Sequence, residues 1–227
     1  MIFRDQHERS LLPKGFVAVA LLTSICISAS LMFSREVEIF GLQAYKTNGD
    51  LMRRILILAC FIIYFLRLLM TLFVFFRRKM YWIEAIIIAN LLPWVFPYVA
   101  YIGGNNKHAI GEIEVIGILL FFFGSYLNTA SEYSRHTWKR KEENQGHLYI
   151  QGLFRYARHV NYLGDLILFT GLVMVAHQFV LLIIPFSMGG IFVLILIPLK
   201  ERYLRNKYGR EFEEYAVGTK RLIPMIY

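Results

Sequence analysis

One short stretch of this sequence is polar, basic and aromatic at once, and apolar runs flank it on both sides. It reads Arg155-Tyr156-Ala157-Arg158-His159-Val160-Asn161-Tyr162-Leu163-Gly164-Asp165. Asn161 and Asp165 are four residues apart, so a helix that begins here carries both on one face. A carboxylate inside an apolar helix is costly and usually functional, because a charge there loses its hydration. The alternative, a helix cap with interfacial Tyr anchors, does not explain an acid inside an apolar helix, so we interpret this stretch as a place where chemistry occurs.

A second polar row precedes it, at spacings of four, four and three residues. Its members are Asn128, Glu132, His136 and Lys139. If the apolar run before them continues as a helix, all four project from one face. Two interpretations stay open. The row is either a solvated helix end or a groove for a ligand such as a nucleotide, whose phosphates would meet the basic run Lys139-Arg140-Lys141.

A third candidate lies inside another apolar run, where Arg67 stands about twelve residues from the start. A guanidinium at that depth needs an acid such as Glu84, a polar cavity or a bound anion. Tyr64 is three residues earlier and shares its helix face. A phenol beside a guanidinium is a suitable proton donor, so this pair is a candidate catalytic group.

The elements that must position these groups are membrane helices. The 227 residues are 57% hydrophobic with a mean hydropathy of +0.48, and the apolar residues form runs of about twenty, the length that spans a bilayer. The sequence predicts an all-α polytopic bundle, one integral membrane domain over 1–227. Its six expected spans are 15–33, 55–76, 81–102, 110–129, 162–176 and 179–199. A seventh, split span near Pro93 and Pro97 stays open.

The orientation follows from the distribution of positive charge. The four segments 1–14, 77–80, 130–160 and 200–227 hold 19 of the 25 Lys and Arg residues. Cytoplasmic loops are enriched in these residues. We therefore expect both termini in the cytoplasm, in a bacterial inner membrane or the endoplasmic reticulum. The formal charge of +9 then needs no nucleic-acid partner. The last two spans form a hairpin, which should make 130–160 and 200–227 neighbours.

Other chemistries find little support. Cys26 and Cys60 lie inside apolar runs and are expected to be core thiols, without a disulfide. No cluster of His, Cys, Asp and Glu has the spacing of metal ligands, and no Gly-rich phosphate loop follows a strand. In the tail, Tyr208, Phe212 and Tyr215 fit one face of a helix that lies on the membrane surface or against the core.

Taken in order, these features resemble the membrane-embedded reductases related to steroid 5-alpha-reductase and the sterol C14 and delta-7 reductases. The resemblance covers 124–227. Its motifs are Asn128 to Lys139, Gly152-Leu153-Phe154, Tyr156, Asn161-Tyr162-Leu163-Gly164-Asp165 and the ending Lys220-Arg221-Leu222-Ile223-Pro224-Met225-Ile226-Tyr227. The run Arg-His-x-Asn-Tyr-x-Gly-Asp is nearest the sterol-reductase branch. Tyr64 and Arg67, with Arg78 eleven residues on, resemble the segment that carries the proton-donating Tyr of steroid 5-alpha-reductases.

The resemblance implies that NADPH delivers a hydride to an activated carbon–carbon double bond of a lipid that enters from the bilayer. It places Asp165 beside the nicotinamide and the substrate, and makes Tyr64 the group that protonates the substrate carbonyl. Together with the polar rows, it gives a set of cofactor-binding residues. They are Arg67, Arg78, Asn128, Glu132, His136, Lys139, Tyr156, Arg158, His159, Asn161 and Tyr203.

Two departures argue against a 3-keto steroid substrate. The Gln-Glu pair of steroid 5-alpha-reductases has no match in 15–33, and Leu199 stands where they carry a His. The alternative is an S-adenosylmethionine-dependent isoprenylcysteine carboxyl methyltransferase, which shares the Arg-His opening and the basic tail. Those enzymes have Pro where Val160 stands, no acid at Asp165, and paired Glu residues where Glu201 is alone. A non-catalytic lipid-binding relative is a third possibility.

Overall fold

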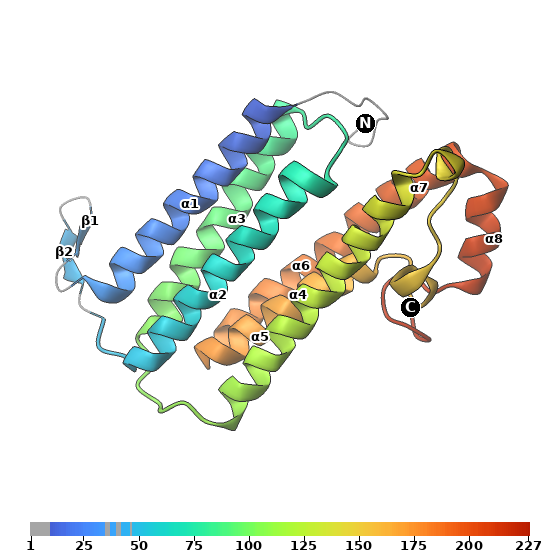
Figure 1. Cartoon of the computed structure of the whole chain (residues 1–227). Helices are drawn as coiled ribbons and strands as arrows, with labels where there is room; N and C mark the ends of the chain where they lie inside the picture. The colour runs from blue at the N-terminus through green and yellow to red at the C-terminus, as the bar shows by residue number, and fades with distance from the viewer. Residues whose placement is uncertain (1–9, 35–36, 40–41, 46) are drawn as a thin grey trace. The chain divides into compact units, whose positions relative to one another are not determined.

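The computed structural model describes residues 10–34, 37–39, 42–45 and 47–227, which are mostly helical (Figure 1). The helices are α1 Leu11–Phe33, α2 Leu51–Met70, α3 Trp82–Gly104, α4 Glu112–Lys139, α5 Val160–Ala176, α6 Ile183–Ile191, α7 Ile197–Tyr208 and α8 Arg210–Gly218. The predicted all-α class is confirmed. Between α1 and α2, the strands β1 Val37–Ile39 and β2 Leu42–Tyr45 form a short antiparallel hairpin that the sequence did not indicate.

Shorter helical turns connect or extend these helices. A π-helical turn, Thr71–Phe75, continues α2, and a second one, Phe192–Leu196, joins α6 to α7. Three 3₁₀ turns lie at Glu142–Asn144, Gly152–Arg155 and Phe179–Leu182. Because α6, the π-helical turn and α7 follow one another directly, the last apolar segment runs as one helical element from Phe179 to Tyr208.

Among the described residues, five helical segments are long and apolar enough to cross a membrane. They are Leu11–Phe33, Leu51–Phe75, Trp82–Gly104, Glu112–Lys139 and Phe179–Tyr208. The remaining apolar helix, α5, has 17 residues and is shorter than the other spans. The α3 helix continues through Pro93 and Pro97 rather than splitting there. The prediction of a polytopic helical membrane protein is confirmed.

Residue contacts divide the chain into two compact units. The carboxyl-side unit comprises Phe122–Phe169 and Ile183–Tyr227. The amino-side unit comprises the described residues of Ile2–Phe121 and Thr170–Leu182. The carboxyl-side unit therefore begins close to the start of the 124–227 region that resembles the reductases.

In the amino-side unit, α1, α2 and α3 pack against one another (Figure 1). The Phe61 and Phe96 rings stack with their centroids 4.2 Å apart and fasten α2 to α3. Asp50 caps α2, since its side chain accepts a hydrogen bond from Arg53 N at 2.8 Å. Cys60 is buried as expected, but Cys26 is exposed on α1, so the prediction of a core thiol there was wrong.

In the carboxyl-side unit, α4 and α5 approach so closely that their backbones nearly touch. A Cβ atom added to Gly164 would lie 2.7 Å from the Asn128 nitrogen and 2.7 Å from the Gly124 oxygen. Only glycine fits at Gly164, because a side chain would need the two helices to separate. This close approach brings the polar residues of α4 within hydrogen-bonding reach of α5.

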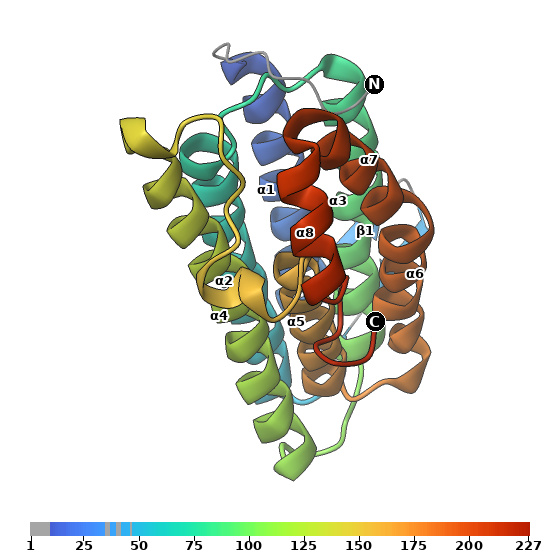
Figure 2. The ribbon, with the colours of Figure 1, turned by 90° about the vertical axis from the view of Figure 1, so that its right-hand side faces the viewer.

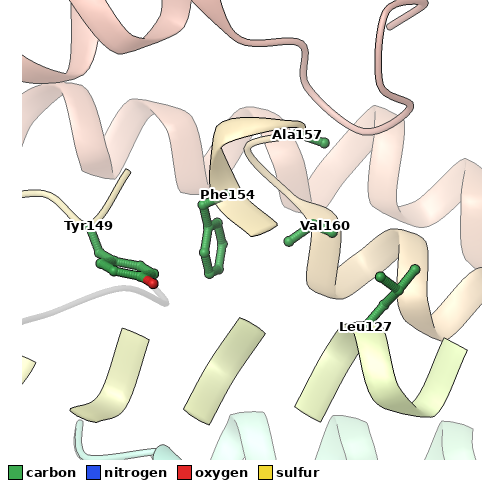
Figure 3. Packing of buried hydrophobic residues seen from close by; sticks show 5 residues of the cluster. All are labelled: Leu127, Tyr149, Phe154, Ala157 and Val160. Carbon is green, nitrogen blue, oxygen red and sulfur yellow. The ribbon is translucent and has the colours of Figure 1, made fainter. Parts of the chain in front are cut away.

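The segment between α4 and α5 folds back onto α4 through an apolar cluster (Figure 3). The buried members of this cluster are Leu127, Tyr149, Phe154, Ala157 and Val160. Figure 3 shows Leu127 of α4 beside Val160 at the start of α5. The cluster holds the polar stretch from 155 to 165 against the helix that carries the first polar row.

The tail lies beside the same stretch, as the sequence predicted. Ala157 and Lys220 form an isolated parallel bridge, and Arg158 N donates to Lys220 O at 2.8 Å. The tail is not one helix: Gly209 has φ +51° and separates α7 from α8 (Figure 2). Phe212 of α8 is completely buried, which favours packing against the core over lying on the membrane surface.

Candidate functional site

The buried polar side chains of α4 and α5 form one hydrogen-bonded group. Asn128 Nδ2 donates to the Asn161 carbonyl oxygen at 3.0 Å, and Asn161 Nδ2 donates to Glu132 Oε1 at 3.0 Å. All three residues are buried. The α4 helix does continue to Lys139, so the predicted polar row stands on one helix face. The structure thus brings the two polar rows found in the sequence into contact.

One atom of this group is left unsatisfied. Asn161 is 6% exposed, and within the part of the chain that the structure describes no hydrogen-bond partner reaches its Oδ1. Buried polar atoms are nearly always hydrogen-bonded, and leaving an acceptor unpaired costs about 1–3 kcal/mol. An orphan acceptor of this kind favours a bound ligand that donates a hydrogen bond.

A cation stands beside the same carboxylate. Arg135 forms an ion pair with Glu132 Oε2, the oxygen that does not face Asn161. The Arg135 guanidinium also lies over the Phe154 ring, with Cζ 5.5 Å from the centroid. Phe154 belongs to the apolar cluster of Figure 3. Arg135 was not among the residues predicted from the sequence, because it does not belong to the polar row of Asn128, Glu132, His136 and Lys139.

Lys139 closes α4 and already has partners within the protein. Its Nζ donates to the Tyr208 hydroxyl at 3.1 Å and to the His147 carbonyl oxygen. The same ammonium group lies 5.3 Å from the Trp138 ring centroid. Lys139 is half-buried, which leaves part of its side chain accessible. A phosphate group binding here would compete with the His147 carbonyl for the ammonium group.

A second polar centre surrounds Glu201 of α7. Arg158 Nε donates to Glu201 Oε1 at 2.9 Å, and Arg221 Nε donates to Oε2 at 3.2 Å. His159 Nε2 lies 3.5 Å from Oε1. Sequence reasoning gave Glu201 no role, although its position as an acid among basic tail residues was a usable signal. This cluster ties the tail to the start of α5.

His159 is completely buried in this centre and stacks on Tyr162, with ring centroids 5.5 Å apart. Burial lowers the pKa of His159 to about 4, despite the opposing effect of the Glu201 carboxylate. The imidazole is therefore neutral at physiological pH. Arg158 and His159 are engaged with the protein itself, and their predicted contact with a cofactor stays a prediction.

The other predicted residues of this unit are more accessible. Asp165 is half-buried on α5, one helical turn beyond Asn161. His136 and Tyr203 are also half-buried, and the Tyr203 hydroxyl accepts from Lys207 Nζ at 3.4 Å. Tyr156 is 60% exposed. Asp165 thus shares the helix and the first turns with Asn161, as the four-residue spacing predicted.

Three predicted residues belong to the amino-side unit. Tyr64 and Arg67 are both buried, and Arg67 Cζ lies 4.8 Å from the centroid of the Tyr64 ring. This contact confirms that the two side chains share a helix face. Glu84, a partner considered for Arg67, forms an ion pair with Arg78, whose Nη1 lies 2.9 Å from Glu84 Oε2.

The amino-side unit also contains a charge cluster that sequence reasoning missed. Arg53 Nη2 and Glu114 Oε1 are 2.7 Å apart, and their side chains are 0% and 1% exposed. His177 Nδ1 approaches the same oxygen to 2.5 Å. Arg53 Nη1 also donates to the Val175 carbonyl oxygen at 2.6 Å. These contacts join α2, α4 and the end of α5, which is a structural role.

One family model matches this chain, and its description names no activity. A family model described as "Protein of unknown function (DUF1295)" matches residues 70–219, which include both polar rows. The match also covers Glu201, Arg135 and Asp165. The residues that form the hydrogen-bonded group on α4 and α5 are therefore part of the matched region.

Curated proteins with similar sequences are enzymes of two classes. "3-oxo-5-alpha-steroid 4-dehydrogenase 2" of Homo sapiens is 28% identical over 112 residues, 49% of this chain and 42% of that protein. The protein of the same name from Rattus norvegicus is 26% identical over 111 residues, 49% of this chain and 42% of that protein. "Probable protein-S-isoprenylcysteine O-methyltransferase" of Oryza sativa subsp. indica is 30% identical over 126 residues, 50% of this chain and 62% of that protein. The chain spans about half the length of the curated relatives it matches.

Proposed function

We propose that this chain, which belongs to the DUF1295 family, is an NADPH-dependent membrane reductase that transfers a hydride to an activated carbon–carbon double bond of a lipid. The observation that carries this proposal is the buried hydrogen-bonded group on α4 and α5, with its unsatisfied Asn161 Oδ1. The similarity to a steroid dehydrogenase supports the reaction class. The exposed apolar surfaces of the long helices suit a substrate that dissolves in the bilayer.

The residues of this group suit a nicotinamide dinucleotide in charge and hydrogen bonding. The carboxamide of such a cofactor carries N–H donors. Asn161 Oδ1 accepts no hydrogen bond from the described residues, so a carboxamide N–H could supply the missing donor. Arg135 and Lys139 stand on the same helix as cations that phosphates can contact. We assign Asn128, Glu132 and Asn161 to the nicotinamide end and Lys139 to a phosphate.

When bound, NADPH supplies a hydride to one carbon of the double bond, and a proton must then reach the substrate to balance the charge. In our proposal Tyr64 donates this proton from its hydroxyl to the conjugated carbonyl oxygen. The Arg67 guanidinium, 4.8 Å from the Tyr64 ring, stabilises the phenolate that remains. General acid catalysis of this kind contributes about 10²–10⁴-fold to a rate.

Asp165 is assigned to orient the reacting groups. It lies one turn beyond Asn161 on α5, so both side chains can face the same bound ligand. A carboxylate accepts hydrogen bonds and suits the second N–H of a carboxamide. Asp165→Asn keeps the size of this side chain and replaces one acceptor with a donor. We expect that variant to fold, to bind NADPH more weakly and to lose turnover.

The second candidate is an S-adenosylmethionine-dependent methyltransferase, favoured by the 30% identity to the isoprenylcysteine enzyme. Val160 and Asp165 argue for the reductase, since the methyltransferases usually have Pro and no acid at these positions. Nucleotide binding separates the two. Titration calorimetry on the detergent-solubilised protein should show binding of NADPH and none of S-adenosylmethionine. Binding of S-adenosylmethionine alone would replace the reductase with the methyltransferase, and binding of neither would leave a non-catalytic relative.

A further inference from the structure

We infer that Arg135 is a positioning residue that fixes which end of the Asn161 amide faces the ligand. The site is thereby made selective for a ligand group that donates an N–H. The identity of that ligand, a nicotinamide carboxamide, rests on the proposed function. The orientation of the amide itself follows from contacts within α4, α5 and the segment that joins them.

Glu132 divides its two carboxylate oxygens between two neighbours. Oε2 accepts from Arg135 Nη2, and Oε1 accepts from Asn161 Nδ2 at 3.0 Å. Glu132 is buried, so water does not compete freely for either oxygen. The arginine therefore holds the carboxylate in the one rotamer in which the second oxygen meets Asn161.

The contact with a carboxylate determines how the Asn161 amide is turned. The two ends of a side-chain amide have nearly the same shape, and only hydrogen bonding distinguishes them. A carboxylate accepts hydrogen bonds, so the NH₂ end must face Glu132 and the oxygen must face away. That oxygen is the buried acceptor without a hydrogen bond among the described residues. It can be satisfied by a donor and it repels another acceptor.

Packing keeps Arg135 where this arrangement needs it. Its guanidinium lies 5.5 Å from the centroid of the Phe154 ring. Phe154 is buried in the apolar cluster that fastens the connecting segment to α4 (Figure 3). Loss of the guanidinium frees the Glu132 carboxylate to turn along α4. The Asn161 amide can then flip, and its NH₂ group can face the ligand.

The experiment compares two ligands that differ in one donor. NADP⁺ carries a carboxamide, and its 3-acetylpyridine analogue carries a methyl ketone that accepts but cannot donate. Their dissociation constants are measured by titration calorimetry on the solubilised full chain. The variants are Arg135→Met, Arg135→Lys and Glu132→Gln. The matched control is Arg210→Gln, because Arg210 forms an exposed ion pair with Glu214 on α8. Thermal unfolding checks that each variant is folded.

We expect the wild type and Arg210→Gln to prefer NADP⁺ by about ten- to a hundredfold, the effect of one unsatisfied buried acceptor. Arg135→Met and Glu132→Gln should reduce this ratio to below about threefold, and Arg135→Lys should lie between. A merely structural role would weaken both ligands equally and keep the ratio.

Three results would overturn the inference. One is a wild type that binds NADP⁺ without preferring it, and another is an Arg135→Met variant that keeps the wild-type ratio. Should Arg135→Met fail to fold, a full wild-type ratio in Glu132→Gln is equally decisive. A wild type that binds neither nucleotide removes the proposed function and this inference with it. In the first two results the wild type still binds NADP⁺, so they overturn this inference alone.

Discussion

Asn161 Nδ2 donates to Glu132 Oε1 across 3.0 Å, and this bond joins the start of α5 to the carboxyl-terminal half of α4. The bond exists because Gly164, one turn along α5, lets the two helix backbones approach. The candidate site therefore depends on helix packing as well as on its own residues.

Lys139→Ala should weaken NADPH more than NADH, if Lys139 contacts the 2′-phosphate that only NADPH carries. A charge-assisted contact contributes about 1.5–3 kcal/mol, or roughly ten- to a hundredfold in affinity. Because Lys139 Nζ already donates to Tyr208, the lower end of this range is expected. Dissociation constants for both nucleotides test this, with the exposed Lys107→Ala as a control for net charge. Equal losses for NADPH and NADH would reject this role.

Tyr64→Phe should keep NADPH binding and lose most turnover, because it removes a hydroxyl and preserves the ring. The ring itself packs edge-on against Phe96, with centroids 5.6 Å apart, so the fold should be retained. We expect a loss of about 10²–10⁴-fold in single-turnover NADPH oxidation with a lipid enone. Phe96→Leu, which changes the packing but no hydroxyl, is the matched control. A Tyr64→Phe variant that turns over at the wild-type rate would assign the proton to another donor.

The stability of the protein should fall between about pH 6.5 and pH 4 because of His159. Burial lowers the pKa of His159 to about 4 in the folded state, whereas the unfolded chain has the ordinary value near 6.5. Below pH 6.5 the unfolded state binds a proton that the folded state does not, so acid favours unfolding. The full effect is on the order of 3 kcal/mol and levels off below about pH 4.

The measurement is the thermal unfolding midpoint of wild type and His159→Gln across this pH range. Glutamine does not titrate, so the variant should lose less stability on acidification than the wild type does. His147, which is exposed, provides the control substitution, His147→Gln. Parallel pH curves for wild type and His159→Gln would contradict a neutral buried imidazole in the folded state.

Glu114→Gln should destabilise the amino-side unit, because it leaves the Arg53 guanidinium buried without its carboxylate. Both side chains are at most 1% exposed, and breaking such a pair costs about 3–5 kcal/mol. Glu143→Gln is the control, since Glu143 pairs with Lys141 at an exposed site where little loss is expected. Comparable unfolding midpoints for the two variants would show that the buried pair contributes no more than the exposed one.

Local features of this protein could be predicted from its sequence. The apolar runs determined the long helices, since a chain in lipid must satisfy its backbone within each segment. Spacings of three and four residues placed Tyr64 with Arg67, and Asn161 with Asp165, on shared faces. The continuation of α4 to Lys139 followed from the polar row itself.

Conformational breaks inside continuous sequence patterns were harder to predict. The periodicity of Tyr208, Phe212 and Tyr215 is that of one helix, yet Gly209 adopts φ +51° and starts a new one. The exposed position of Cys26 on α1 likewise depends on which face of that helix meets α3. In a helix that is apolar all round, the sequence marks no buried face.

The partners of polar side chains from different elements were decided by tertiary structure. Arg135 meets Phe154, Glu201 gathers Arg158 and Arg221, and Arg53 finds Glu114. Arg135 and Glu132, by contrast, are three residues apart on one helix and pair locally. A helix fixes the direction of a side chain through its 3.6-residue period, but the neighbour in that direction depends on how closely two helices pack. At α4 and α5 this distance is set by Gly124 and Gly164, whose lack of a side chain allows the hydrogen bond between Asn161 and Glu132 to form.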